Sequence, residues 1–134
     1  MKGLFAALLF SVPLAMPTHA QTVSDVKFKA GNFGAMVNGT IIGDEYIDYR
    51  LGAKKGQTMF VDLGVDGTNG SGTVYFNILP PGSDGVAIYN SSIEGNTTTV
   101  KLPSSGNYRI RVYQMGNDAD AGKTSGFHID LSIQ

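Results

Sequence analysis

The side chains that could do covalent chemistry are few in this sequence. Beyond the first 20 residues there is one histidine, His128, and no cysteine, so a hydroxyl nucleophile would have a single candidate base. His128 alternates with the apolar Phe127 and Ile129, which predicts a solvent-facing position on a strand. Carboxylates that could pair for glycoside hydrolysis are scattered rather than set in a motif; they are Asp44, Glu45, Asp48, Asp118 and Asp120. We therefore expect a protein that is not an enzyme.

Metal and nucleic-acid binding are weakly supported as well. One histidine without cysteine does not supply a zinc site. Calcium remains an alternative in two oxygen-rich loops, Gly64–Gly72 and Met115–Ser125, although neither has the spacing that ends in a bidentate glutamate. The candidate ligands are Asp62, Asp66, Asn69 and Ser71 in or just before the first loop, and Asn117, Asp118 and Asp120 in the second. We expect no cofactor and no structural metal. Three arginines and a net charge of −2 beyond residue 20 exclude a broad nucleic-acid-binding face.

One row of side chains indicates a binding surface. A strand predicted over Asn107–Gln114 turns three apolar residues inward, which leaves Arg109, Arg111 and Tyr113 on the other face. The row leads directly into the Met115–Ser125 loop. Arginine and tyrosine are enriched at protein interfaces because they combine a large apolar body with directed hydrogen bonds. We predict that this row and its loop contact a partner.

The elements that must position this row are short strands. Apolar and polar residues alternate from Val26 onward, and clusters of glycine, asparagine and aspartate separate the runs. The clearest strands are Ile47–Ala53, Met59–Val65, Val74–Ile78, Tyr108–Val112 and Phe127–Ile133; weaker ones are Val26–Ala30, Ala35–Ile42, Val86–Tyr89 and Thr98–Leu102. No window predicts an amphipathic helix. About eight short strands at this spacing predict an all-β, antiparallel β-sandwich or barrel in a single domain.

The first 20 residues have the pattern of an export signal. Lys2 precedes an apolar run from Leu4 to Leu14, and Ala20 supplies the small residue for cleavage. The apolar run is too short for a permanent membrane anchor. We expect a soluble exported domain over residues 21–134, and because it has no cysteine, a bacterial periplasm is the predicted compartment.

Two segments of the sequence resemble the periplasmic inhibitors of goose-type (g-type) lysozyme. They are Phe28–Gln57 and Leu102–Thr124. In the second segment the matching features are an SG-x-Y turn at Ser105, Gly106 and Tyr108, an R-V-x-Q run from Arg111 to Gln114, and NDA at Asn117–Ala119. In the first segment they are AKKGQ at Ala53–Gln57 and the residues Gly39, Gly43, Tyr46 and Tyr49. The resemblance implies that a strand end and its loop plug a lysozyme cleft. Where the family has arginines on both sides of NDA, this chain has Gly116 and Asp120. Arg109, Arg111 or Lys123 would then supply the missing cation, or the target differs.

A broader resemblance is to the pre-peptidase C-terminal type of jelly-roll module, through the strand that ends in R-V at Arg111 and Val112. It implies the alternative function, a stand-alone module that binds envelope glycan or has a structural role. The lysozyme type and the oligomeric state stay open at this point. The predicted partner-binding residues are Ser105, Gly106, Tyr108, Arg109, Arg111, Tyr113, Asn117, Asp118 and Lys123.

Overall fold

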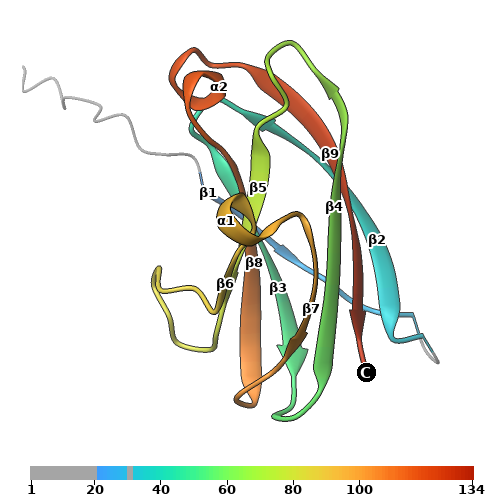
Figure 1. The fold of residues 1–134 in the computed structure, drawn as a ribbon. Coiled ribbons are helices and arrows are strands. Elements are labelled where there is room, and N and C mark those ends of the chain that lie inside the picture. The colour runs from blue at the N-terminus through green and yellow to red at the C-terminus, as the bar shows by residue number, and fades with distance from the viewer. Residues whose placement is uncertain (1–20, 30–31) are drawn as a thin grey trace, which may run out of the picture.

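The computed structural model describes residues 21–29 and 32–134, so the predicted signal peptide lies outside the described residues. These residues form nine strands and two one-turn helices (Figure 1), and neither helix is long enough to cross a membrane. The elements are β1 (Gln21–Asp25), β2 (Gly34–Ile42), β3 (Tyr46–Ala53), β4 (Thr58–Thr68), β5 (Val74–Leu79), β6 (Tyr89–Asn90), α1 (Ser91–Glu94), β7 (Thr97–Lys101), β8 (Gly106–Gln114), α2 (Asn117–Asp120) and β9 (Thr124–Ile133). The all-β class predicted from the alternation is confirmed.

The strands form two sheets that share one core. One sheet has the order β1-β3-β8-β5-β6 and the other the order β2-β9-β4-β7. The inward residues predicted from the alternation belong to a single buried cluster contributed by both sheets. They are Tyr49, Leu51, Val61, Phe76, Ile110, Val112, Ile129 and Leu131. Period-two burial therefore decides which face of each strand turns inward.

Two local strand predictions and one burial prediction are wrong. Residues Val26–Lys29 are not in a strand, because the first strand is β1, ending at Asp25. The strand predicted over Val86–Tyr89 shrinks to the two residues of β6, since a turn closed by the Ser83 hydroxyl precedes it and leaves Val86 exposed. Val65 lies in β4 as predicted, but it is exposed instead of in the core; a bulge between Val65 and Gly67 follows it and shifts the register of the strand against β9.

The pairing of β1 departs from the predicted antiparallel architecture. It runs parallel to β3, with Gln21 opposite Tyr46 and Asp25 opposite Arg50. Every other pairing among the described strands is antiparallel. After β1 the chain passes to β2 in the other sheet, so no hairpin forces β1 to turn back beside its successor. Alternation alone reports the buried face of a strand and not its direction.

The two predicted loops are shorter than expected. β4 continues against β9 as far as Thr68, so only residues 69–73 connect it to β5. The helical turn α2 occupies part of the Met115–Ser125 segment, and β9 begins at Thr124. Three of the side chains considered for calcium make hydrogen bonds within the protein: Asp62 accepts from Thr97, Asp66 pairs with His128, and Asn69 accepts from Thr124. In the described ranges, no three acidic or histidine side chains gather as a metal site would require.

Candidate partner-binding site

Asp118 anchors α2 to the connection between β4 and β5. Its side chain is buried, and its carboxylate accepts hydrogen bonds from the Ser71 N–H (2.9 Å), the Thr73 N–H (3.0 Å) and the Thr73 hydroxyl (2.7 Å). These donors, the Ser71 N–H first, lower the pKa of Asp118 to about 2. A Cβ at Gly70 would overlap the carboxylate, so glycine leaves the room that the anchor needs. Asp118 was predicted to touch a partner; the structure shows that its carboxylate also positions the loop.

Gln114, at the end of β8, fixes the other side of the same loop. Its side-chain amide donates to the Lys123 carbonyl (2.8 Å) and the Gly43 carbonyl (3.3 Å), and its oxygen accepts from the buried Ser125 hydroxyl (2.7 Å). The Gly43 N–H also donates to the Lys123 carbonyl (2.8 Å). The β2–β3 turn, α2 and the start of β9 are therefore tied together at one end of the molecule (Figure 1). The sequence analysis used Gln114 only as part of a motif. Gln114 lies two residues after the inward-facing Val112 on the same strand, and this spacing was the signal that its side chain also points inward.

Between these anchors, three residues form an exposed segment, which we call the loop tip: Met115, Gly116 and Asn117. Gly116 has φ 63° and ψ −138°, a backbone conformation that side chains rarely adopt. Thr73 holds the base of the tip, because its backbone carbonyl accepts from the Met115 N–H (3.1 Å) and its hydroxyl contacts the Met115 carbonyl (2.9 Å). The tip thus projects from a fixed base.

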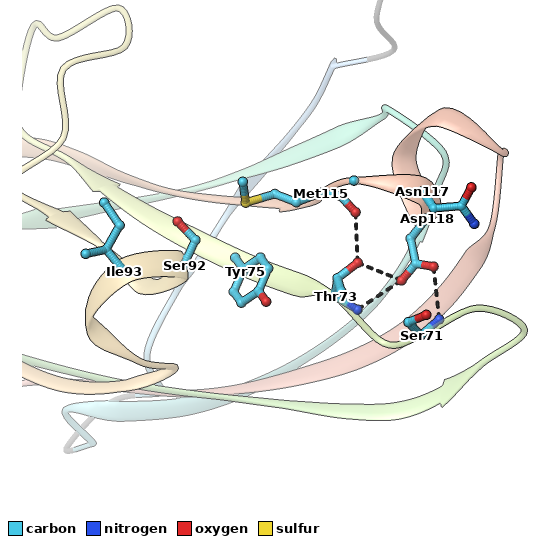
Figure 2. A pocket seen from close by; sticks show the side chains of 9 residues that line it. Ser71, Thr73, Tyr75, Ser92, Ile93, Met115, Asn117 and Asp118 are labelled. Carbon is cyan, nitrogen blue, oxygen red and sulfur yellow. Dashed lines mark hydrogen bonds between the residues drawn. The ribbon is translucent and has the colours of Figure 1, made fainter.

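A groove lies beside the loop tip, between α1 and α2 and over β5. Figure 2 shows Tyr75 of β5 between Ile93 of α1 and Met115 of the tip, with Asp118 farther along. Its volume is about 410 Å³, and most of its lining is apolar. The full lining consists of Ser71, Thr73, Tyr75, Ser92, Ile93, Met115, Gly116, Asn117 and Asp118. Sequence reasoning missed the α1 side of this groove; the signal was a lone isoleucine within the polar run NSSIEGN.

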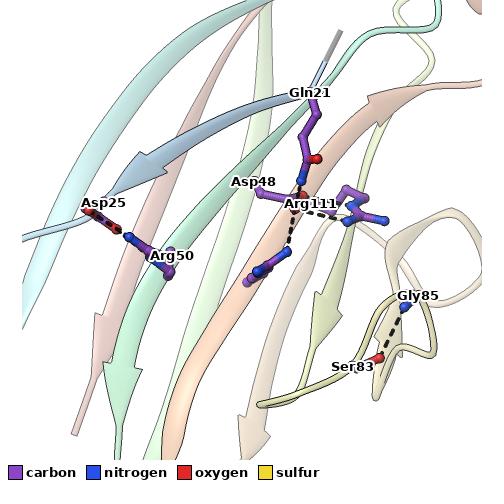
Figure 3. A network of polar contacts seen from close by, with 8 residues as sticks. Gln21, Asp25, Asp48, Arg50, Ser83, Gly85 and Arg111 are labelled. Carbon is purple, nitrogen blue, oxygen red and sulfur yellow. Dashed lines mark hydrogen bonds and ion pairs between the residues drawn. The ribbon is translucent and has the colours of Figure 1, made fainter. Parts of the chain in front are cut away.

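Arg111 is engaged within the protein by a buried carboxylate. Its Nε and Nη2 donate to the two oxygens of Asp48 at 2.8 and 3.0 Å (Figure 3), and Asp48 is fully buried. Gln21 donates to the same carboxylate at 2.9 Å, and Arg109 Nη1 lies 3.6 Å from it. The Arg111 guanidinium also lies over the Tyr46 ring, 4.5 Å from its centre. The Arg111 guanidinium, which we predicted to contact a partner, is therefore already paired within the protein.

Three more predicted site residues lie away from the loop tip. Tyr108 is fully buried, and its hydroxyl donates to the Ser104 carbonyl (2.6 Å). Ser105 and Gly106 stand at the start of β8, whereas the loop tip follows its end. Nine strand residues at about 3.3 Å each separate the two turns by about 30 Å. Ser105 and Gly106 therefore lie at the opposite end of β8 from the loop tip, and their contact with a partner stays a prediction.

The remaining predicted residues surround the tip or the face below it. Asn117 is exposed on the tip itself, and Lys123 follows α2 with a half-buried side chain. Tyr113 is half-buried on the outer face of its sheet, where its hydroxyl donates to Asn77 (2.9 Å). Arg109 is the more exposed arginine of β8, since 39% of its side chain is accessible against 21% for Arg111.

Comparison with known proteins places the chain in a family. No protein-family model matches it. The inhibitor of g-type lysozyme of Escherichia coli strain K12 is 32% identical over 131 residues, which cover 98% of this chain and 92% of that protein. The chain belongs to the family of g-type lysozyme inhibitors. The resemblance drawn from its SG-x-Y, R-V-x-Q and NDA motifs is thereby confirmed.

Solved structures agree with this family. A periplasmic lysozyme inhibitor of g-type lysozyme from Aeromonas hydrophila superposes with a TM-score of 0.77 at 35% identity, over 86% of this chain and 98% of that one. The corresponding inhibitor from Salmonella Typhimurium gives 0.66 at 29% identity, over 84% and 98%. The pre-peptidase C-terminal domain of a Bacillus anthracis collagenase reaches 0.54 at 13% identity, over 87% and 97%, which is a likeness of fold alone.

Proposed function

We propose that the protein is an exported, non-catalytic inhibitor of g-type lysozyme that works in the periplasm. The observation that carries the proposal is the 32% identity to a g-type lysozyme inhibitor along almost the whole chain. The two solved inhibitors described above as periplasmic support the compartment. We further propose that the two sheets form a β-sandwich of jelly-roll type, in which a domain of residues 21–134 follows the cleaved signal.

The loop tip is the part of this scaffold best suited to enter an enzyme cleft. It is exposed, while its base is held by the Asp118 and Gln114 hydrogen bonds. A segment ordered before binding loses less conformational entropy when the complex forms. Asn117 would supply hydrogen bonds at the tip, and Met115 would supply apolar area. Lys123, Tyr113 and Arg109 would contact the enzyme around it, and Arg111 would support this face through Asp48.

The backbone at Gly116 limits how an arginine could be placed beside NDA. A side chain there would have to adopt φ 63°, at a strain on the order of 1–3 kcal/mol. Asp120 is exposed at the end of α2, and its φ is not positive. If arginine replaces both Gly116 and Asp120, the strain at position 116 should therefore oppose the gain in lysozyme inhibition that two added cations would give. Asp120→Arg is the substitution that tests a cation at this site without straining the loop.

The test is inhibition of purified goose-, chicken- and invertebrate-type lysozymes by the exported protein. We expect the goose-type enzyme to be inhibited, and Asn117→Ala to weaken that inhibition about tenfold by removing a hydrogen-bonding group worth about 1.4 kcal/mol. Asn107→Ala is the matched control, because Asn107 is an exposed asparagine near the other end of β8. If every lysozyme stays fully active at micromolar protein, the inhibitor function is refuted and the glycan-binding module becomes the better explanation.

A further inference from the structure

We propose that the groove between α1 and α2 is a second part of the lysozyme-binding surface, and that it receives a basic side chain, lysine or arginine, from the enzyme. The inference rests on the proposed function and adds to it both a location and a chemistry. The groove is continuous with the loop tip, because Met115, Gly116 and Asn117 line it as well as forming the tip. An enzyme that encloses the tip would therefore also cover the groove.

The walls of the groove suit the stem of a long side chain. Ile93 is 82% exposed and Met115 is 44% exposed, so both apolar side chains face solvent, and Figure 2 shows them with Tyr75 along the groove. Lysine and arginine carry apolar stems that cover such surfaces while the charged end stays polar. The Tyr75 ring adds a favourable face for a cation. A volume of about 410 Å³ accommodates a side chain rather than a folded element.

The charges around the groove favour a cation over a neutral or acidic group. Asp118 lines the groove, and its carboxylate accepts hydrogen bonds from neutral donors. Within the described residues, no salt bridge joins Asp118 to a lysine or arginine. Glu94 and Asp120 are exposed on the two helical turns that border the groove. No lysine or arginine is among the lining residues. Lys123, which follows α2, offsets one of these three carboxylates, so the groove and its border keep a net negative charge that an incoming cation would offset.

The test compares two nearly identical exposed residues. Ile93 is 82% exposed and Val86 is 81% exposed, so Ile93→Lys and Val86→Lys place the same charge at equally accessible positions inside and outside the groove. Dissociation constants for purified goose-type lysozyme should rise at least thirtyfold with Ile93→Lys and less than twofold with Val86→Lys. Thermal melts of both variants check that the fold is retained.

A third variant separates the charge from the apolar contact. Ile93→Asp removes the same apolar wall and adds a negative charge, so it should weaken binding clearly less than Ile93→Lys, and raising NaCl from 50 to 300 mM should weaken the wild-type complex. Equal effects of Ile93→Lys and Val86→Lys would overturn the groove as a contact. Equal losses with Ile93→Asp and Ile93→Lys would overturn the basic occupant. A wild-type protein that does not bind the enzyme overturns the proposed function itself, and the groove's role with it.

Discussion

Replacing Arg111 with alanine should destabilise the fold, in contrast to the effect on partner binding alone that the sequence led us to expect. The substitution removes the 2.8 and 3.0 Å hydrogen bonds that Asp48 accepts and leaves this fully buried carboxylate with Gln21 at 2.9 Å and Arg109 at 3.6 Å. Removing one partner of a buried ion pair costs about 3–5 kcal/mol. Because Arg109 still lies near the Asp48 carboxylate, we expect the loss at the lower end of this range, about 3 kcal/mol in the free energy of unfolding.

Urea denaturation measures this loss, and a melting temperature about 10 °C lower should accompany it. Arg50→Ala is the matched control, because Arg50 makes a similar two-point pair with Asp25 whose side chains are 42% and 54% exposed. The urea midpoint of that variant should stay close to that of the wild type, since exposed pairs contribute little. Adding Asp48→Ala to Arg111→Ala should recover part of the lost stability by removing the stranded charge. If Arg111→Ala unfolds at the wild-type urea concentration, the buried pair is not what holds this face together.

Three further predictions follow from buried groups, and one from the expectation that folding needs no metal. Ile110→Ala should lower the free energy of unfolding by about 2–5 kcal/mol, because Ile110 is fully buried in the core; a loss below about 1 kcal/mol in urea would contradict that packing. Tyr108→Phe should cost about 1 kcal/mol through the lost Ser104 bond and leave lysozyme inhibition unchanged, and a change in inhibition would show that Tyr108 reaches the interface. The pKa of Asp118 is lowered from 3.8 to about 2, so its stabilisation of α2 is complete above about pH 4 and is lost as the pH falls through 2. Urea denaturation midpoints measured between pH 2 and 5 should show this pH dependence. The Asp118→Asn variant should show a weaker pH dependence. Thermal melts with and without a chelator should coincide, and a drop of many degrees would point to a metal held by the loop oxygens.

The sequence alone determined the fold class, the inward face of most strands and the family. Burial on one side of a strand imposes a period of two, and that pattern is written in consecutive residues. Val61, Phe76, Ile110 and Ile129 could therefore be assigned to the core one strand at a time. The SG-x-Y, R-V-x-Q and NDA motifs are also local, so they could be read without knowing which segments meet.

Only the tertiary structure decided which polar groups are already satisfied within the protein. Arg111 meets Asp48 across 63 residues of sequence, and Asp118 meets Ser71 across 47. These internal hydrogen bonds could not be predicted, because they depend on which distant segments meet and in what register, and alternation within a single strand does not contain this information. The same reason explains the parallel direction of β1. The groove beside Ile93 likewise exists only because α1 and α2, distant in sequence, flank β5 in the fold.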